Sequence, residues 1–315
     1  MSYFLAIDAG GTKTQCLLAD ETRVLARATT GTVKLMRVSE QEATARLRAM
    51  LAEVAANAGV SLGQVARTCF GLAGLRSPAA RAWAEKSFAE LVAGELLLCG
   101  DEEIALDAAF RGGPGILVVA GTGSNAIGRS ANASLFGAGG WGPVLGDEGS
   151  GTWIGLEAIR AALRTHDGMP LGDSSTFLLR EIERQWKLNS LGELVAYANR
   201  RGDSDQLATD FASLTPVVAR CADAGDPLAV EVLTRAGEQL AELVALVFRK
   251  MNAAPAATPE EPIAIGVAFT GSVLARINQV RATMTARLAV LLPAASVRQS
   301  PVDPLEGALW RARRG

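Results

Sequence analysis

Residues 3–14, YFLAIDAGGTKT, combine a strand pattern with residue types that bind anions. The apolar run ends at Asp8, and the loop that follows is made of Gly10, Gly11, Thr12, Lys13 and Thr14. Glycines let the backbone turn and let another atom approach it, and successive N–H groups converge on the oxygens of an anion. This loop therefore predicts a phosphate site, with a plain glycine-rich hairpin turn as the alternative.

The same arrangement occurs twice more along the chain. The buried-strand pattern of residues 116–120 runs into a loop made of Gly121, Thr122, Gly123, Ser124 and Asn125. A further strand pattern, residues 263–270, ends at Gly271 and Ser272. The repetition favours the phosphates of a nucleotide over unrelated turns.

A short apolar strand pattern, residues 96–99, delivers Asp101 to the start of a helix that is expected to run to Phe110. A carboxylate at the carboxyl end of a strand in an open α/β sheet is well placed to accept a proton from a substrate. Helix capping is the other role open to Asp101, and the two roles are compatible. Asp107 follows on the same helix, and we expect it to be solvated.

Residues 136–155, FGAGGWGPVLGDEGSGTWIG, form the most glycine-dense part of the chain. Glycines at this density weaken regular structure, which predicts a shaped loop whose backbone approaches a ligand. Trp141, between Gly140 and Gly142, offers a flat apolar face, and Asp147 offers acceptors for hydroxyl groups. A flexible surface loop is the alternative, but it fits an exposed tryptophan and few charges less well.

The composition is that of an ordinary soluble protein, with 49% hydrophobic residues, 20% charged residues and a formal net charge of −2 over 315 residues. This length favours two domains. The near-neutral charge argues against nucleic acid or an anionic membrane surface as a partner. The chain shows neither a secretory leader pattern nor the apolar run of a membrane helix, so we expect a cytoplasmic protein.

Cysteine and histidine usage narrows the possible chemistry. The four cysteines, at positions 16, 69, 99 and 221, lack CxxC spacing, which favours buried structural thiols over a zinc or iron–sulfur site. His166 is the only histidine, which excludes any site that needs two. For this residue, stabilisation of a helix end is favoured over a place in a Ser-His-Asp triad.

Apolar periodicity, glycines and prolines predict alternating strands and helices. The GGPG stretch at residues 112–115 predicts a domain boundary, and residues 252–262 predict a surface linker. Further strands are expected at residues 14–20, 23–28, 67–73 and 296–299. Helices are expected at residues 39–57, 78–91, 150–164, 272–292 and 304–314, and through most of 174–251.

With these segments placed, the chain resembles the superfamily of sugar kinases, actin and heat-shock ATPases. Within it, the chain resembles the BadF/BadG/BcrA/BcrD ATPase family, which contains the N-acetylglucosamine kinases. The resemblance is carried by AIDAGGTKT (6–14), GDEEIALDAA (100–109), VAGTGSNA (119–126), GGWGPVLGDEGSGTWIG (139–155), AGDPLA (224–229) and FTGSVL (269–274).

The resemblance implies an α/β fold with two ribonuclease-H-like domains, as in actin-like ATPases, flanking a central cleft. The N-terminal domain would span residues 1–113 and be closed by the C-terminal helix at about 300–315. The C-terminal domain would span 114–299 and carry a helical insert. The family also implies a homodimer.

Carried over by position, the resemblance implies roles for the residues of these motifs. Residues 10–14 and 121–123 would hold the ATP phosphates, and Gly271 and Ser272 would lie beside the adenosine. Asp8 would orient hydrated Mg²⁺. Asp101 would contact the sugar and act as the catalytic base. The remaining sugar-binding set would be Ser124, Asn125, Gly140, Trp141, Gly142 and Asp147.

Lys34 departs from the family pattern, since sugar-binding members usually carry an asparagine in this loop. A cation there could meet an acidic substituent of the substrate, as on N-acetylmuramic acid, or could point to solvent. The sequence therefore predicts an ATP-dependent kinase of the 6-hydroxyl of an amino sugar. N-acetylglucosamine is the first candidate, and N-acetylmuramic acid and glucosamine remain open.

A second activity in the same family is the ATP-hydrolysing activator of acyl-CoA dehydratases or reductases. Activators of the dehydratase type hold an iron–sulfur cluster through cysteines at a subunit interface. The cysteines of this chain do not follow such a motif, so we rank the activator below the kinase.

Overall fold

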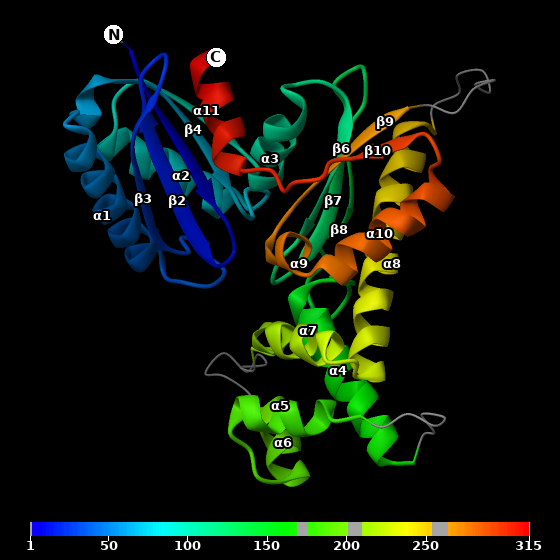
Figure 1. The fold of residues 1–315 in the computed structure, drawn as a ribbon. Helices are drawn as coiled ribbons and strands as arrows, with labels where there is room; N and C mark the ends of the chain where they lie inside the picture. Colours follow the sequence, from blue (N-terminus) through cyan, green and yellow to red (C-terminus); the bar gives the residue numbers. More distant parts are fainter. Residues whose placement is uncertain (1, 169–175, 201–209, 254–263, 315) are drawn as a thin grey trace. The chain divides into compact units, whose positions relative to one another are not determined.

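The computed structural model describes residues 2–168, 176–200, 210–253 and 264–314 (Figure 1). The chain forms two compact units. Unit 1 comprises Met1–Leu117, Ile127–Leu135 and Val302–Gly315, and unit 2 comprises Val118–Ala126 and Phe136–Pro301. Most of the linker predicted at residues 252–262 lies outside the described residues.

Unit 1 is built on a five-stranded mixed sheet in the order β3-β2-β1-β4-β5. β2 is antiparallel to both β1 and β3, whereas β4 is parallel to both β1 and β5. Because β1, β4 and β5 run in the same direction, their carboxyl ends lie at one edge of the sheet. The strands are β1 (Tyr3–Ala9), β2 (Lys13–Ala19), β3 (Val24–Gly31), β4 (Val65–Leu72) and β5 (Glu95–Cys99).

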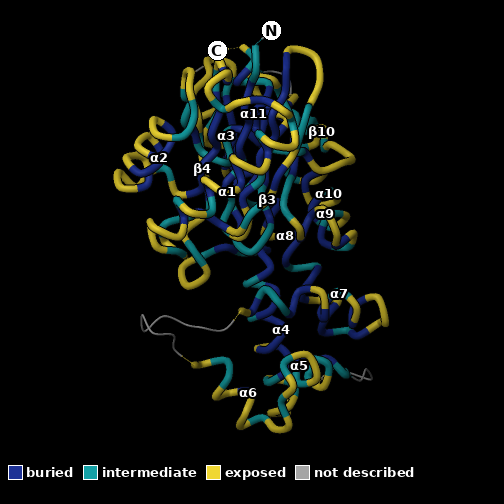
Figure 2. The backbone as a smooth tube through the Cα atoms, turned by 90° about the vertical axis from the view of Figure 1, so that its left-hand side faces the viewer, coloured by how far each residue is buried: buried dark blue, intermediate teal, exposed yellow. Residues whose placement is uncertain are grey.

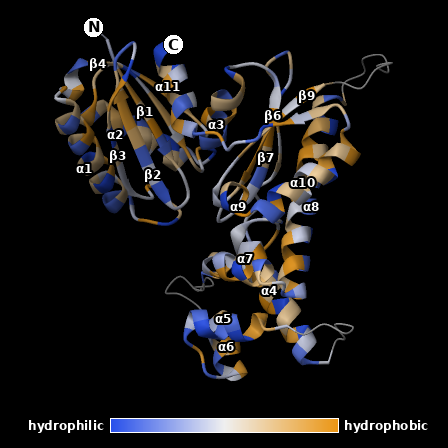
Figure 3. Ribbon diagram, in the orientation of Figure 1, coloured by the Kyte–Doolittle hydropathy of each residue, from blue (hydrophilic) through white to orange (hydrophobic). Residues whose placement is uncertain are grey.

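Helices cover both faces of this sheet (Figure 1). They are α1 (Glu40–Ala58), α2 (Pro78–Leu91), α3 (Asp101–Phe110) and α11 (Pro304–Arg314), with a short 3-10 helix, η1, at Leu62–Gln64. Alternate residues of β1 point to opposite faces, as a strand requires. Leu5 and Ile7 join the core beneath α1 and α2, and Phe4 and Ala6 join the core beneath α3 and α11. Figure 3 shows apolar colouring on β1 and β4.

The predicted start and end of α1 are confirmed in detail. Ser39 is the N-cap, and its Oγ accepts a hydrogen bond from the Glu42 N–H at 3.2 Å. Gly59 ends the helix with a φ of 65°, a left-handed conformation that glycine adopts without strain. Local capping chemistry therefore fixes this helix before any tertiary contact is considered.

α3 and α11 cross with their backbones in contact. A Cβ at Gly307 of α11 would lie 1.8 Å from the carbonyl oxygen of Ile104 and 2.5 Å from the nitrogen of Ala108. Only the hydrogen of a glycine fits in this space. The C-terminal helix is thereby joined closely to α3, and Figure 2 shows both helices with buried residues along their length.

Unit 2 contains a second five-stranded sheet, in the order β10-β9-β6-β7-β8. Counted along the chain, its strands follow the same spatial order as those of unit 1. The end of β7 and its turn into β8 group with unit 1. The strands are β6 (Gly115–Ala120), β7 (Ser124–Arg129), β8 (Leu135–Gly139), β9 (Ile265–Thr270) and β10 (Ala295–Val297).

The rest of unit 2 is helical, as predicted. Asp226 explains the AGDPLA stretch, because this fully buried carboxylate caps α8 by accepting from the N–H groups of Leu228 and Ala229. Its second oxygen accepts from the Phe177 N–H at 2.8 Å. The helices are α4 (Gly151–His166), α5 (Leu178–Trp186), α6 (Leu191–Ala198), η2 (Phe211–Leu214), α7 (Thr215–Asp223), α8 (Pro227–Met251), α9 (Ser272–Arg276) and α10 (Asn278–Leu291).

Three segments differ from the sequence prediction. Residues 124–129 and 135–139 form β7 and β8, where the glycine content predicts a loop over 121–125 and from 136 onward. Pairing within a sheet overrides the weak strand preference of glycine. The helix predicted over 272–292 is divided at Ile277 into α9 and α10. In the described part of the chain, none of the helices combines the length and apolar character that a membrane span needs.

The α3–α11 crossing gives a direct test of the fold. We expect Gly307→Ala to lower the free energy of unfolding by about 1–3 kcal/mol, because the added methyl group overlaps backbone atoms that have no side-chain rotation to relieve the clash. Gly63→Ala in the same unit is the control, since its Cβ would meet only Ser61 Oγ, at 3.5 Å. Equal stability of the two variants in urea unfolding would contradict this crossing.

Candidate active site

Asp8 and Asp101 lie at the carboxyl ends of β1 and β5, the edge at which parallel strands place their ligand-binding residues. Both are half-buried, and the two carboxylates are close enough to repel each other. Burial raises the pKa of Asp8 to about 6, and the charge of Asp303 adds to the rise, whereas Lys13 opposes it. Unit 1 therefore concentrates negative charge at this edge.

Asp101 has the chemistry expected of a proton acceptor. Burial raises its pKa well above the usual value, and a hydrogen bond with Glu102 and the charges of Glu102 and Asp8 raise it further. Lys34 opposes this rise. Burial and nearby negative charge destabilise the ionised carboxylate, so Asp101 takes up a proton more readily than a solvated aspartate does. The charge of Lys34 limits this effect.

Lys34 is tied to the same edge by its backbone and by its side chain. Its N–H donates to Thr32 Oγ1 at 3.1 Å, and that hydroxyl donates to the carbonyl oxygen of Gly10 at 2.9 Å. A Cβ at Gly74, in the turn after β4, would lie 3.5 Å from Lys34 Cε. The lysine side chain thus passes along the end of β4, and its charge acts on Asp101.

The Gly10–Thr12 turn joins β1 to β2 and leaves its backbone open. The Gly10 N–H donates to the Lys13 carbonyl oxygen at 3.0 Å, and a Cβ at Gly11 would meet no atom within 4 Å. Thr12 and Lys13 are exposed. Thr14 is different, because its side chain is fully buried and its hydroxyl has no hydrogen-bond partner among the described residues. Thr12 and Lys13 are therefore the exposed residues of this loop, and Gly10 and Gly11 are partly buried.

In unit 2, the Gly121–Gly123 turn is held by the first residues of α4. The Gly151 N–H donates to the Gly121 carbonyl oxygen at 2.7 Å, and Thr152 Oγ1 donates to the Thr122 carbonyl oxygen at 2.7 Å. The following Ser124 hydroxyl donates to the Glu148 carbonyl oxygen at 2.7 Å. The carbonyl oxygens of this turn are therefore held by hydrogen bonds from α4.

The third glycine turn lies beside this second one. Gly271 has a φ of 96°, and a Cβ there would lie 2.3 Å from the Ala120 carbonyl oxygen and 2.9 Å from the Gly121 nitrogen. Ser272 starts α9, and its nitrogen lies 4.0 Å from the position of a Cβ on Gly121. The ends of β6 and β9 therefore lie side by side. This places Gly271 and Ser272 next to the Gly121 turn within unit 2.

Asp147 links the glycine-dense segment to the same turn. Its side chain is 7% exposed, and its Oδ1 accepts from the Gly142 N–H at 3.2 Å. A Cβ at Gly123 would lie 2.7 Å from Asp147 Oδ2. Gly140 lies against Asn125 in the same way, with its Cβ position 3.3 Å from Asn125 Cβ. Trp141 is 72% exposed, so its ring is free to cover a ligand.

The structure corrects one sequence prediction and adds residues that the sequence did not indicate. Asp107 is not solvated: it is 1% exposed and forms an ion pair with Arg129 at 2.8 Å. Thr32 and Glu102 contact residues of the candidate site and are not among the predicted site residues, although Glu102 falls within the GDEEIALDAA motif. All four cysteines are buried, which confirms their prediction as structural thiols, and burial raises the pKa of Cys16 to about 12.

The described residues contain no group of three or more histidine, cysteine or acidic side chains that could hold a metal ion by themselves. A family model for BadF/BadG/BcrA/BcrD ATPases matches residues 5–312, which is nearly the whole chain. The chain belongs to this family of ATPases.

Similar members of known description are sugar kinases. The chain is 32% identical over 242 residues to an N-acetylmuramic acid/N-acetylglucosamine kinase of Clostridium acetobutylicum, covering 76% of this chain and 77% of that protein. It is 27% identical over 320 residues to an N-acetyl-D-glucosamine kinase of Dictyostelium discoideum, covering 97% and 96%. A solved Chromobacterium violaceum structure, described as a candidate N-acetylglucosamine kinase, matches with a TM-score of 0.74, 25% identity and 98% coverage of both chains.

The raised pKa of Asp8 predicts how stability depends on pH in this ATPase without ligands. The folded chain keeps a proton on Asp8 up to about pH 6, whereas the unfolded chain loses it near pH 4, so stability falls as pH rises between these values. We expect Asp8→Asn to stabilise the protein by about 1–3 kcal/mol at pH 7.5 and to have little effect at pH 4.

Asp20→Asn is the matched control for this measurement. Asp20 accepts hydrogen bonds from Thr22 and Arg23, which lower its pKa to about 2, so the substitution should destabilise the protein at pH 7.5. Urea unfolding at the two pH values distinguishes the two cases. A loss of stability in Asp8→Asn at pH 7.5 would show that the Asp8 carboxylate is stabilised by its surroundings.

Proposed function

We propose that this chain is an ATP-dependent kinase that phosphorylates the 6-hydroxyl of an N-acetylated amino sugar, with N-acetylglucosamine as the first candidate. The observation that carries the proposal is the position of Asp101, at a strand end beside Asp8 and Lys34, with its pKa raised by burial. Relatives described as N-acetylglucosamine kinases support the substrate class.

Asp101 acts as the general base in this reaction. Its carboxylate accepts the proton of the sugar 6-hydroxyl as that oxygen forms a bond with the γ-phosphorus. The bond from the γ-phosphorus to the bridging oxygen breaks, and ADP leaves with the electron pair. Lys34 favours the ionised form of Asp101, because its charge opposes the rise in pKa that burial and the charges of Glu102 and Asp8 cause.

The glycine turns bind the nucleotide. Residues 10–13 and 121–123 meet the phosphate oxygens through backbone N–H groups other than those of Gly10 and Gly121, which bond within their own turns, together with the Thr12 hydroxyl and the Lys13 ammonium. Gly271 and Ser272 lie beside the adenosine, since they contact the Gly121 turn. Thr14 acts indirectly in this scheme, because its side chain is buried.

Asp8 fits a hydrated Mg²⁺ bound with the nucleotide. The pKa of Asp8, about 6, is raised by burial and by the charge of Asp303. A bound cation would stabilise the ionised form of this half-buried carboxylate. Mg²⁺ is usually held by one or two carboxylates plus substrate phosphates, so a cage of protein ligands is not required. When bound, the ion would neutralise charge on the phosphates.

The sugar is held by the glycine-dense segment. Asp147 presents a buried carboxylate next to the Gly123 turn, where it can accept bonds from sugar hydroxyls. Asn125 lies against Gly140, and the exposed ring of Trp141 can cover an apolar sugar face. Ser124 orders this segment through its bond to the Glu148 carbonyl oxygen.

The activator function that also occurs in this family is supported less well. A cluster shared between subunits needs cysteines at the surface, whereas the side chains of Cys16, Cys69, Cys99 and Cys221 are all buried. Burial also raises the pKa of the Cys221 thiol to about 11, which disfavours the thiolate that binds iron. The homodimer implied by the family remains a prediction.

Removal of the base gives the first test of the kinase. We expect sugar-dependent ADP release from Mg-ATP with one amino sugar, and a fall in kcat of about 10²–10⁴-fold in Asp101→Asn, because the amide cannot accept the proton. The panel is N-acetylglucosamine, glucosamine, N-acetylmuramic acid and glucose. ATP hydrolysis at the same rate with every sugar, or without any, would contradict the proposal.

Lys34 gives a test of selectivity. Its ammonium would favour a sugar that carries an acidic substituent, so Lys34→Met should lower kcat/KM for N-acetylmuramic acid more than for N-acetylglucosamine, by about 10-fold. Lys86→Met removes an exposed lysine of α2 and is the control. An unchanged ratio between the two sugars in Lys34→Met would exclude a role of this residue in selectivity.

A further inference from the structure

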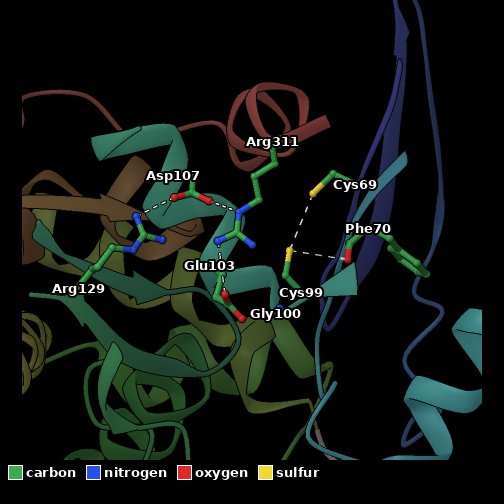
Figure 4. A network of polar contacts seen from close by, with 8 residues as sticks. All are labelled: Cys69, Phe70, Cys99, Gly100, Glu103, Asp107, Arg129 and Arg311. Carbon is green, nitrogen blue, oxygen red and sulfur yellow. Dashed lines mark hydrogen bonds and ion pairs between the residues drawn. The ribbon is translucent and has the colours of Figure 1, made fainter. Parts of the chain in front are cut away.

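The first turn of α3, which carries Asp101, is connected to the C-terminal helix through two side chains (Figure 4). The Gly100 N–H donates to Glu103 Oε1 at 3.1 Å. The other oxygen of Glu103 accepts from Arg311 Nη2 at 3.4 Å. The residue directly before Asp101 is thus connected to α11, 208 positions beyond Glu103 in the chain.

Arg311 is itself anchored by buried charge. Its Nε donates to Asp107 Oδ2, and Asp107 Oδ1 lies 2.8 Å from Arg129 Nη1. The Asp107 side chain is 1% exposed and that of Arg129 is 7% exposed. Buried ion pairs tolerate little displacement, because a charge that loses its partner there is strongly destabilised. The guanidinium that holds Glu103 therefore has a fixed position.

The first turn of α3 needs this support. The first N–H groups of a helix have no partner within the helix, and Asp101 is the first residue of α3. Two bonds close the turn on the Gly100 carbonyl oxygen, one from the Glu103 N–H at 3.1 Å and a longer one from the Ile104 N–H at 3.4 Å, and both leave the Gly100 N–H to the Glu103 side chain. The close crossing at Gly307 holds Ile104 and Ala108 but does not reach Gly100.

We propose that Glu103 and Arg311 are positioning residues that hold the Gly100–Asp101 turn, and with it the Asp101 carboxylate, in place for the sugar hydroxyl. Neither residue touches substrate in this account. The inference rests on the function proposed for Asp101. It identifies the residues that hold Asp101 in position. Glu102 remains the direct hydrogen-bond partner of Asp101.

The test is the effect of Glu103→Ala on steady-state kinetics. We expect kcat to fall by about 10-fold or more, while KM for ATP and for the sugar changes by less than about 2-fold, because a small misplacement of a catalytic group acts on the chemical step. Glu306→Ala is the matched control, since Glu306 is the exposed third residue of α11 as Glu103 is the third residue of α3. The control should keep full activity.

A double-mutant cycle separates positioning from a general structural role. If Glu103 acts through Asp101, adding Glu103→Ala to Asp101→Asn should not lower the residual kcat further. A further fall of about 10-fold in the double variant would show that Glu103 acts elsewhere, and it would overturn the proposal.

Arg311→Met is the second variant and should reproduce the kcat loss of Glu103→Ala. If Arg311→Met does not fold, because Asp107 and Arg129 lose a partner, Glu103→Ala decides the question alone, since it leaves that buried pair intact. Sugar-dependent turnover in the wild type with full kcat in Glu103→Ala would overturn the positioning role alone. A wild type without sugar-dependent turnover would overturn the proposed function as well.

Discussion

Two half-buried carboxylates, Asp8 and Asp101, at one edge of one sheet are the constraint on which the rest of this structure depends. Burial raises the cost of ionising both, and the charge of Asp8 adds to the cost for Asp101. Lys13 and Lys34 offset part of it. A protein accepts such a cost in the empty state when a bound cation or a transferred proton later relieves it.

The surrounding elements hold this charge in place. Parallel pairing of β1, β4 and β5 brings the strand ends together, and the Thr32 hydroxyl ties the Lys34 loop to Gly10. α11 returns to unit 1 from the far end of the chain and meets α3 at Gly307. The C-terminal segment therefore supports the edge of the N-terminal sheet that carries the proposed site.

Unit 2 uses the same strand order for a different task. Its turns present backbone N–H groups, and the one buried carboxylate of the glycine-dense segment, Asp147, lies against Gly123. Positive φ at Gly140, Gly142 and Gly149 explains why this segment is rich in glycine. Acid–base chemistry belongs to unit 1 in this account, and anion and sugar recognition belong largely to unit 2.

Features with local causes could be predicted from the sequence. The helices at Pro78–Leu91 and Pro304–Arg314 have the predicted bounds, because proline fixes their first turn. β7 and β8 could not be predicted, because their strand conformation depends on pairing within the sheet. The burial of Asp107 could not be predicted either, since the residues that cover it, Arg129 and Arg311, come from distant elements.

The same limit applies to the candidate site. Motif spacing was sufficient to indicate Asp8, Asp101 and the glycine turns, because each follows a strand pattern directly. Thr32 lies in an ordinary loop and Glu103 lies within the GDEEIALDAA motif, but the roles of both depend on Gly10 and Arg311, which are distant in sequence. Thr14 belongs to the first motif, yet its side chain is buried, because its position in β2 points it into the core.

The fate of the γ-phosphate tests the central claim most directly. Purified protein would be incubated with N-acetylglucosamine and with Mg-ATP that carries oxygen-18 as a label on the γ-phosphate. The products would be separated and examined by phosphorus NMR. The account predicts label on the 6-oxygen of the sugar, in amounts equal to the ADP formed. Label released as inorganic phosphate, with none on any amino sugar offered, would contradict it.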